Sequence, residues 1–167
     1  MLAEGNEIPI ARRPSLDIAR VSIEDVLQAI VDESSGGLLL HGSGKVIEPA
    51  QHLTLPGFAT DNAGIAILKA IFSNSRDDRD RWTYPFYVNR ESPLVVEVMN
   101  PRPGFVRERG YVYLMKAGGG AFRNDPPRSW QWRAERPDIA FLGRIEVQRT
   151  DFRYPVKEVR RLHERYA

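Results

Sequence analysis

Three short segments of this sequence carry the side chains that could take part in chemistry. They are His41-Gly42-Ser43, then Phe58 with Thr60, and finally the acidic residues Asp125 and Glu135. Histidine and serine hydrogen-bond polar ligands, a phenyl ring presents a π face to flat or cationic groups, and a carboxylate supplies negative charge. These segments lie far apart in the sequence, so any site built from them has to be assembled by the fold.

Several well-defined sites are missing from the sequence. The run from His41 to Lys45, HGSGK, is only superficially like a phosphate-binding loop, because it lacks the Gly-Lys-Ser/Thr ending and does not open a helix. The chain has no cysteine, three scattered histidines and no HExxH motif, so we expect no metal site. The absence of a Gly-x-Ser-x-Gly motif argues against a serine hydrolase.

The elements that must position these residues follow both helical and extended patterns. We expect a helix over residues 22–35, because Ser22 is a good N-cap and apolar residues follow at helical spacing. A second helix, capped by Thr60 or Asp61, is expected to run to about Phe72. The predicted strands cover residues 38–41, 94–98, 111–115, 139–142 and 145–147, and a short helix or frayed end follows Pro155. The pattern is that of an α+β fold.

Length and composition are those of one folded domain. The chain has 167 residues, of which 42% are hydrophobic, and we expect a single domain over residues 1–167. Residues 1–21 contain two prolines and no periodicity, and are expected to form an extended arm. No apolar run reaches the length of a membrane span and no signal-peptide pattern is visible. We therefore expect a cytoplasmic protein, or an effector secreted without a signal peptide.

The order of the segments resembles that of the ADP-ribosyltransferase superfamily, in the branch with a His–Tyr–Glu signature that includes diphtheria toxin and the poly(ADP-ribose) polymerases. In that branch a strand ends in His-Gly-Ser or His-Gly-Thr, as at residues 41–43, and an acidic residue lies near the C-terminus. The strand 110–113, the Asp-Pro turn at Asp125 and the stretch around Arg133 also resemble the small bacterial rifampin ADP-ribosyltransferases. The resemblance covers residues 38–152 and implies a split antiparallel β core with flanking helices.

The resemblance also implies an activity, the transfer of a single ADP-ribose from NAD, as in toxins, effectors and drug-modifying enzymes. Breaking the bond between nicotinamide and ribose builds positive charge on the sugar, so a carboxylate must lie close to it. The resemblance assigns NAD binding to His41, Gly42, Ser43, Phe58 and Thr60, and catalysis to Glu135 or Asp125. Tyr84 and Tyr87 are alternative stacking rings, because Phe58 replaces the tyrosine of the family and follows His41 more closely than usual. The acceptor stays open between protein, nucleic acid and small molecule, and residues 1–37 could contact a partner protein.

Two other functions compete with this one. The chain could be an inactive member of the same fold that binds protein or nucleotide. Alternatively, it could bind nucleic acid, with stacking platforms interleaved with arginines. The aromatic candidates for that role are Tyr111, Trp130 and Trp132, and the basic ones are Arg123, Arg128, Arg133 and Arg136. Release of nicotinamide from NAD would favour the transferase, and salt-dependent nucleic-acid binding the last alternative.

Overall fold

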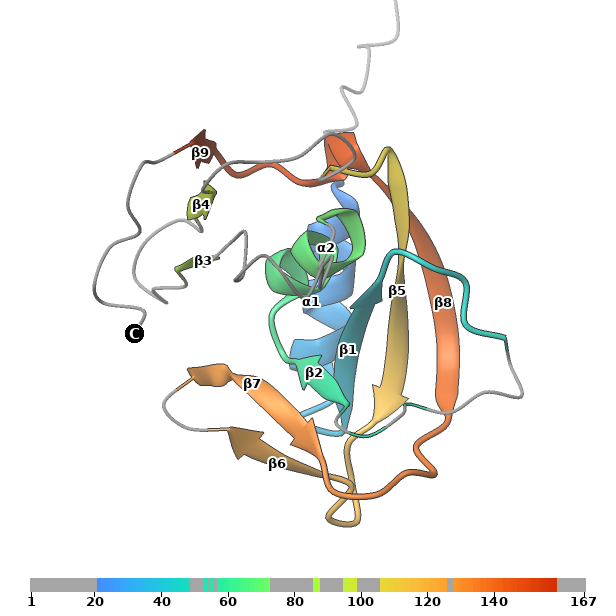
Figure 1. The fold of residues 1–167 in the computed structure, drawn as a ribbon. Helices are drawn as coiled ribbons and strands as arrows, with labels where there is room; N and C mark the ends of the chain where they lie inside the picture. Colours follow the sequence, from blue (N-terminus) through green and yellow to red (C-terminus); the bar gives the residue numbers. More distant parts are fainter. Residues whose placement is uncertain are drawn as a thin grey trace, which may run out of the picture.

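The computed structural model describes residues 21–48, 53, 55, 57–72, 86–87, 95–98, 106–125 and 128–158. Two helices, α1 (Ile23–Glu33) and α2 (Ala63–Ile71), lie against a six-stranded antiparallel sheet (Figure 1). In spatial order its strands are β6 (Phe122–Asp125), β7 (Arg128–Ala134), β2 (Phe58–Thr60), β1 (Leu38–Ser43), β5 (Arg109–Lys116) and β8 (Phe141–Gln148). A smaller sheet contains β3 (Phe86–Tyr87), β4 (Val95–Val98) and β9 (Val156–Glu158), and a 3₁₀ turn, η1, covers Arg149–Asp151. The expected α+β class, with an antiparallel core and flanking helices, is confirmed at this level.

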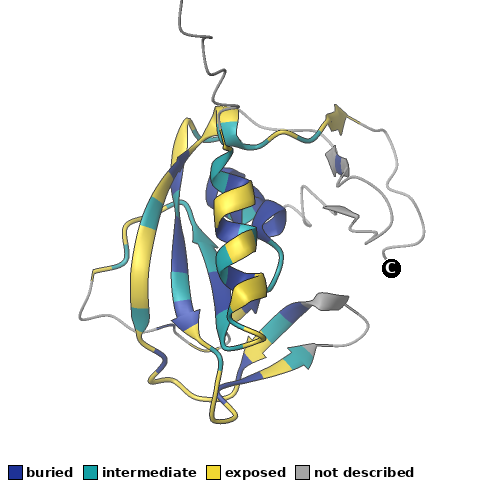
Figure 2. Cartoon of the chain, turned by 180° about the vertical axis from the view of Figure 1, so that it is seen from behind, coloured by how far each residue is buried: buried dark blue, intermediate teal, exposed yellow. Residues whose placement is uncertain are grey.

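Helix α1 forms where the sequence predicted it. The hydroxyl of Ser22 accepts a hydrogen bond from the backbone N–H of Asp25 at 3.1 Å, which satisfies one of the free donors of the first turn. Leu27 and Val31, one turn apart, are buried against the sheet side, while the opposite face of the helix is exposed (Figure 2). None of the described helices is long and apolar enough to cross a bilayer.

Helix α2 begins one or two residues later than the sequence suggested. Its N-cap is Asn62, whose side-chain oxygen accepts from the N–H of Ile65 at 3.0 Å. Thr60 lies in β2 instead, and its hydroxyl accepts from the N–H of Asn62 at 3.1 Å. The prediction that Thr60 or Asp61 caps this helix is therefore wrong, because strand pairing holds Thr60 in extended backbone. Every residue of α2 except Lys69 is buried, so the helix fills the core rather than covering it.

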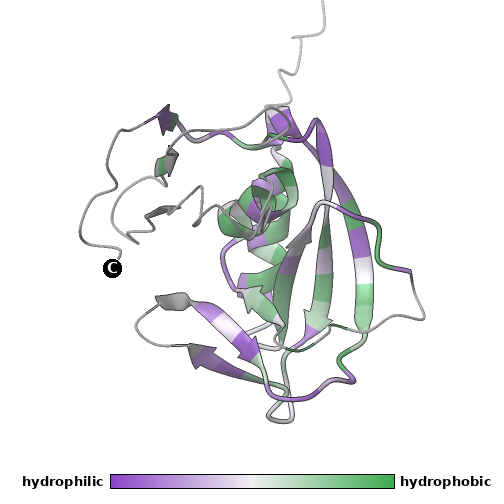
Figure 3. Ribbon diagram, viewed as in Figure 1, coloured by the Kyte–Doolittle hydropathy of each residue, from purple (hydrophilic) through white to green (hydrophobic). Residues whose placement is uncertain are grey.

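The six-stranded sheet carries a hydrophobic cluster on each face. Leu40, Val112 and Val147 point toward the two helices and pack with α2. Leu39 and Met115, their neighbours in alternation, point to the other face and pack with a second set of buried residues. That second set contains Leu53, Ala59, Ala121, Phe122, Ala134 and Ile139. Hydrophobic residues accordingly concentrate on α2 and the central strands (Figure 3).

Two strands near the C-terminus differ from the expectation. The predicted strands 139–142 and 145–147 form one strand, β8, because β8 pairs with β5 from Arg109 to Met115 and carries Gly143 within the ladder. The segment after Pro155, expected to be a short helix or a frayed end, forms β9, which pairs in parallel with β4. Both outcomes depend on pairing with distant strands, which local patterns do not encode.

The sheet is nearly divided between β1 and β2. Six residue pairs join β1 to β5, whereas the pairing of β1 with β2 consists of Leu40 opposite Thr60. Strands β2, β7 and β6 thus form one half, and β1, β5 and β8 the other, and Figure 1 shows β6 and β7 turning away from β5 and β8. The segments singled out in the sequence, residues 41–43 and Phe58, lie at this division.

Candidate functional site

His41 occupies the point where β1 and β2 separate. Its Nδ1 lies 2.7 Å from the backbone carbonyl oxygen of Phe58. A carbonyl oxygen can only accept, so Nδ1 carries the proton and Nε2 the lone pair. Burial lowers the pKa of His41 below its ordinary value, and the charge of Lys69 acts in the same direction. The imidazole is therefore neutral at pH 7, with a defined tautomer.

Aromatic rings hold the His41 side chain on the sheet face away from the helices. Tyr113 is directly opposite on β5, with ring centroids 6.5 Å apart, and Phe141 of β8 lies 6.2 Å away. The Tyr113 and Phe141 rings contact each other at 4.6 Å. The hydroxyl of Tyr113 accepts from the N–H of Ile47 at 2.6 Å, which ties the loop after β1 to this cluster. The sequence patterns did not identify Tyr113 as a site residue, because only the pairing of β1 with β5 places it opposite His41.

Gly42 and Ser43 complete the end of β1. A Cβ on Gly42 would lie 2.0 Å from the carbonyl oxygen of Ala66, so helix α2 packs directly on the glycine. Any contact between Gly42 and a ligand has to come from its backbone edge. The hydroxyl of Ser43 donates to the carbonyl of Lys45 at 2.9 Å and accepts from its N–H at 3.1 Å, which closes a tight turn.

Phe58 presents a partly open ring on β2. Phe58 is 39% exposed as a residue, and the guanidinium carbon of Arg133 lies 5.6 Å from the ring centroid. Phe58 and Arg133 are opposed in the ladder between β2 and β7, so they share one face of the sheet. Thr60, two residues further along, is buried and its hydroxyl is occupied by the N–H of Asn62. The ring of Phe58 is thus the accessible group of β2, and a cation already lies over it.

Glu135 continues this row of side chains. Arg133 is opposed to Arg123 on β6, and the Nε of Arg123 lies 3.3 Å from a carboxylate oxygen of Glu135. This contact brings the carboxylate to the face that carries Arg133 and Phe58. The side chain of Glu135 is 40% exposed and that of Arg123 71%, so water screens the pair and it holds Glu135 only weakly.

The remaining predicted residues are described only in part or not at all. Tyr84 lies outside the described residues. The backbone puts Tyr87 in β3 and Asp125 at the end of β6, and the side chains of both lie outside the described part of the chain. The structure brings together Phe58, Arg133 and Glu135 on one face of the sheet. Thr60, two residues from Phe58, is opposite Leu40, so this is the face that packs on the helices. The His41 side chain lies on the other face and reaches Phe58 only at its backbone carbonyl. Within the described residues, no group of histidine and acidic side chains is arranged to hold a metal ion.

Comparisons with family models, curated protein sequences and solved structures find no match to this chain.

Proposed function

We propose that this chain is an NAD-dependent ADP-ribosyltransferase whose nicotinamide site lies at the division between β1 and β2. The observation that carries the proposal is the open ring of Phe58, which has a guanidinium over it and whose backbone carbonyl binds His41. The antiparallel sheet, divided next to the His-Gly-Ser segment, agrees with the fold that the sequence resemblance implies.

Phe58 suits a flat cationic ligand for electrostatic reasons. The face of a phenyl ring carries negative charge density, and a partly desolvated cation–π contact is worth about 1–2 kcal/mol. Nicotinamide in NAD is a flat cation, and it would take the position that the Arg133 guanidinium occupies in the structure. Arg133, displaced from the ring, would pair with the pyrophosphate, a contact that arginine makes well.

Glu135 would act on the ribose, and His41 would hold the backbone of Phe58 in place. Nδ1 of His41 donates to the Phe58 carbonyl from the opposite face of the sheet, so the imidazole would fix the strand that presents the Phe58 ring. The Glu135 carboxylate would leave Arg123, bind a ribose hydroxyl and stabilise the positive charge that develops on the sugar. Because the ion pair between Glu135 and Arg123 is weak and exposed, breaking it costs little free energy. Asp125 stays the second candidate for the catalytic acid.

The nucleic-acid alternative receives less support from the described side chains. Trp132 is one of the stacking platforms of that alternative. It packs against the buried cluster on the sheet face away from the helices, and the indole nitrogen of Trp132 is buried. Tyr111 has the guanidinium of Arg144 5.4 Å from its ring centroid. These two rings lie on different strands, β7 and β5, that are separated by β2 and β1. They do not form the continuous row of stacking platforms that binding along a strand requires.

The test measures NAD binding and nicotinamide release on the purified chain. Phe58→Ala should weaken NAD binding about tenfold, whereas Phe58→Tyr should keep it, because only the first removes the π face. Glu135→Gln should leave NAD affinity within a few-fold and lower turnover by about a hundredfold, because it removes charge where the transition state needs it.

The outcomes separate the candidate functions. Full turnover in Glu135→Gln with a collapse in Asp125→Asn would move the catalytic role to Asp125. Saturable NAD binding without nicotinamide release would indicate an inactive member of the fold. Absence of saturable NAD binding, or full turnover in both acid variants, would refute the proposal.

A further inference from the structure

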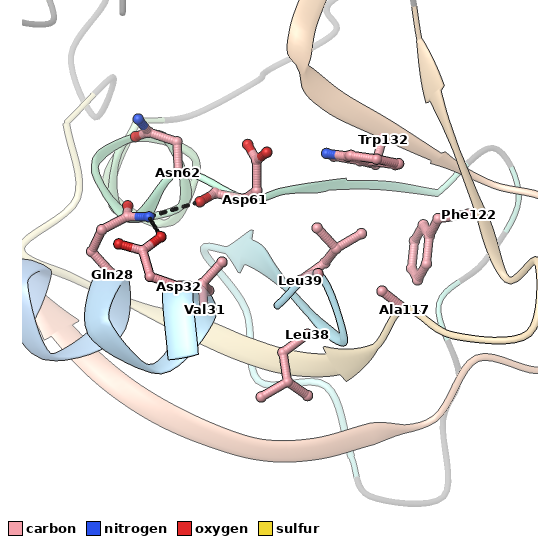
Figure 4. Close-up of a pocket in the computed structure, with 11 residues that line it drawn as sticks. Gln28, Val31, Asp32, Leu38, Leu39, Asp61, Asn62, Ala117, Phe122 and Trp132 are labelled. Carbon is pink, nitrogen blue, oxygen red and sulfur yellow. Dashed lines mark hydrogen bonds between the residues drawn. The ribbon is translucent and has the colours of Figure 1, made fainter. Parts of the chain in front are cut away.

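A second site lies at the start of β1, next to the candidate NAD site but lined by other residues. A pocket of about 460 Å³ opens between the last turns of α1, the start of β1, the end of β2 and strand β7 (Figure 4). This volume is within the range of small-molecule sites in proteins. Leu39, which lines the pocket, is two residues before His41, a separation of about 7 Å along a strand. The pocket therefore adjoins the candidate NAD site, but its lining does not include His41, Phe58, Arg133 or Glu135.

One side of the pocket is acidic, and part of its polar wall is held rigidly. The side-chain nitrogen of Gln28 donates to a carboxylate oxygen of Asp32 at 2.9 Å and to the backbone carbonyl of Asp61 at 3.0 Å. The oxygen of Gln28 accepts from the N–H of Ala63 at 2.9 Å, and the oxygen of Asn62 caps α2. The polar atoms of the Gln28 side chain are thus occupied by hydrogen bonds to neighbouring residues. These bonds fix the backbone of Asp61.

The carboxylate of Asp61 is left available to a ligand. It lines the pocket, and among the described residues it makes no hydrogen bond or ion pair. Asp32 carries the other carboxylate of the lining, and none of the described lining residues is basic. Two carboxylates without a compensating cation attract a positively charged group.

The opposite wall is apolar and contains a buried donor without a partner. Trp132, Leu39 and Phe122 form this wall. Nε1 of Trp132 is the buried side-chain nitrogen for which the described part of the chain offers no acceptor. Figure 4 shows this nitrogen turned toward the side of the pocket on which Asp61 lies. A buried N–H without an acceptor is costly, and an acceptor atom in the pocket would remove that cost.

We infer that this pocket binds an organic cation of the guanidinium type that also carries a carbonyl oxygen. The cationic head lies at Asp61 and Asp32, the aliphatic body lies against Leu39 and Phe122, and the carbonyl oxygen accepts from Nε1 of Trp132. A planar guanidinium suits carboxylates because it offers several N–H donors in a fixed plane. Both a free small molecule and an arginine side chain of another protein have this chemistry. The inference does not depend on NAD binding.

The experiment compares two probes that differ in charge but hardly in shape, Nα-acetyl-arginine amide and Nα-acetyl-citrulline amide. Binding is measured by calorimetry and by the shift of the Trp132 indole N–H resonance. The arginine probe should bind saturably and shift this resonance, and the citrulline probe should bind at least about tenfold more weakly, because it lacks the charge that pairs with Asp61. Asp61→Asn should abolish that preference. The variant should fold, since the contact from Asp61 to Gln28 uses the backbone carbonyl.

Glu33→Gln is the matched control, because it removes one negative charge next to Asp32 on the same helix but outside the pocket. It should leave the preference for the arginine probe intact. Equal binding of both probes, no saturable binding of the arginine probe, or an equal loss in Glu33→Gln and Asp61→Asn would overturn the inference.

A third probe, butylguanidine, tests the role of Trp132. It carries the cationic head and aliphatic body of arginine but no carbonyl oxygen. Trp132→Phe should weaken the arginine probe several-fold and leave butylguanidine unchanged, because the substitution removes the N–H donor and keeps a flat ring. Binding of butylguanidine as strong as that of the arginine probe would refute the carbonyl contact. Stronger binding of free arginine than of the arginine probe would point to a free small molecule, because the acetyl and amide groups of the probe mimic a protein chain. An equal effect of Trp132→Phe on both probes would refute the carbonyl contact.

Discussion

At the scale of single residues, the hydrogen bond from His41 to the carbonyl of Phe58 determines the charge state of the imidazole. Burial disfavours the protonated ring, and the positive charge of Lys69 disfavours it further, so the pKa of His41 lies below its ordinary value of 6.5. In the neutral ring Nε2 carries a lone pair and can accept a hydrogen bond from a hydroxyl group. The same contact joins the two halves of the sheet where backbone pairing between β1 and β2 is limited to Leu40 and Thr60.

This shift predicts a loss of stability in mild acid. Below the unfolded pKa of 6.5 the unfolded chain takes up a proton at His41 that the folded chain does not, so the free energy of unfolding falls as the pH falls. His41→Gln should lose less stability than the wild type between pH 7 and pH 5, measured by urea unfolding at each pH. Parallel curves for the two proteins would show that His41 has an ordinary pKa in the folded state.

At the scale of elements, the close contact between β1 and α2 positions the candidate site. Helix α2 lies so near to Gly42 that its Ala66 carbonyl occupies the place of a Cβ, and Gly110 on β5 is approached in the same way by the carbonyl of Ala70. A buried apolar helix packed directly on strand backbone leaves little room for adjustment. The end of β1, and with it the residues His41 and Ser43, is therefore held in place by α2.

Gly42→Ala should destabilise the protein strongly. The new Cβ would lie 2.0 Å from the Ala66 carbonyl oxygen and 2.8 Å from the N of Ala70, both of them backbone atoms that cannot rotate away. We expect a loss of about 1–3 kcal/mol or more in the free energy of unfolding, measured with denaturant.

The control for this substitution is Gly143→Ala on β8. A Cβ on Gly143 would have nothing within 4 Å, so that substitution should change stability by less than about 0.5 kcal/mol. Equal stability of Gly42→Ala and wild type would show that α2 can move away from β1.

At the scale of the whole molecule, a polar cluster joins the first described helix to the segment that leads into the last strand. The buried carboxylate of Glu24, in the first turn of α1, accepts a short hydrogen bond from the hydroxyl of Tyr154 and contacts Arg153 at 3.3 Å. Tyr154 also packs edge-to-face on Phe152, whose ring contacts Phe72 at the end of α2. Both helices and the C-terminal segment are thus held together, and β9 begins directly after Pro155.

This cluster predicts a loss of stability at alkaline pH. Burial first, and then the hydrogen bond to Glu24, raise the pKa of Tyr154 from 10.0 to about 12. Between these values the unfolded chain releases a proton that the folded chain keeps, so the free energy of unfolding falls as the pH rises. Tyr154→Phe should remove this fall, whereas Tyr111→Phe should retain it. Unfolding midpoints between pH 9 and pH 12 test this, and an unaltered alkaline fall in Tyr154→Phe would contradict it.

Much of the local structure could be predicted from the sequence, because it depends on residues three or four apart. The cap at Ser22, the helix that follows it and the strand after Gly37 all come from such patterns, and the structure confirms them. Predictions failed where distant pairing overrides a local preference. Thr60 is a good capping residue, but its pairing with Leu40 and Gln131 keeps it in β2 and passes the cap to Asn62.

The candidate site shows the same limit. From the sequence alone, His41, Phe58 and Glu135 could be chosen by type and order, because residue chemistry is local. Only the tertiary structure decided that the imidazole binds the Phe58 carbonyl, that Arg133 lies over the ring, and that Arg123 holds Glu135. It also decided that Asp61 and Trp132, 71 residues apart in the numbering, line one pocket. Each of these contacts is set by strand register and helix docking, where a shift of one residue would turn every side chain of a strand to the other face.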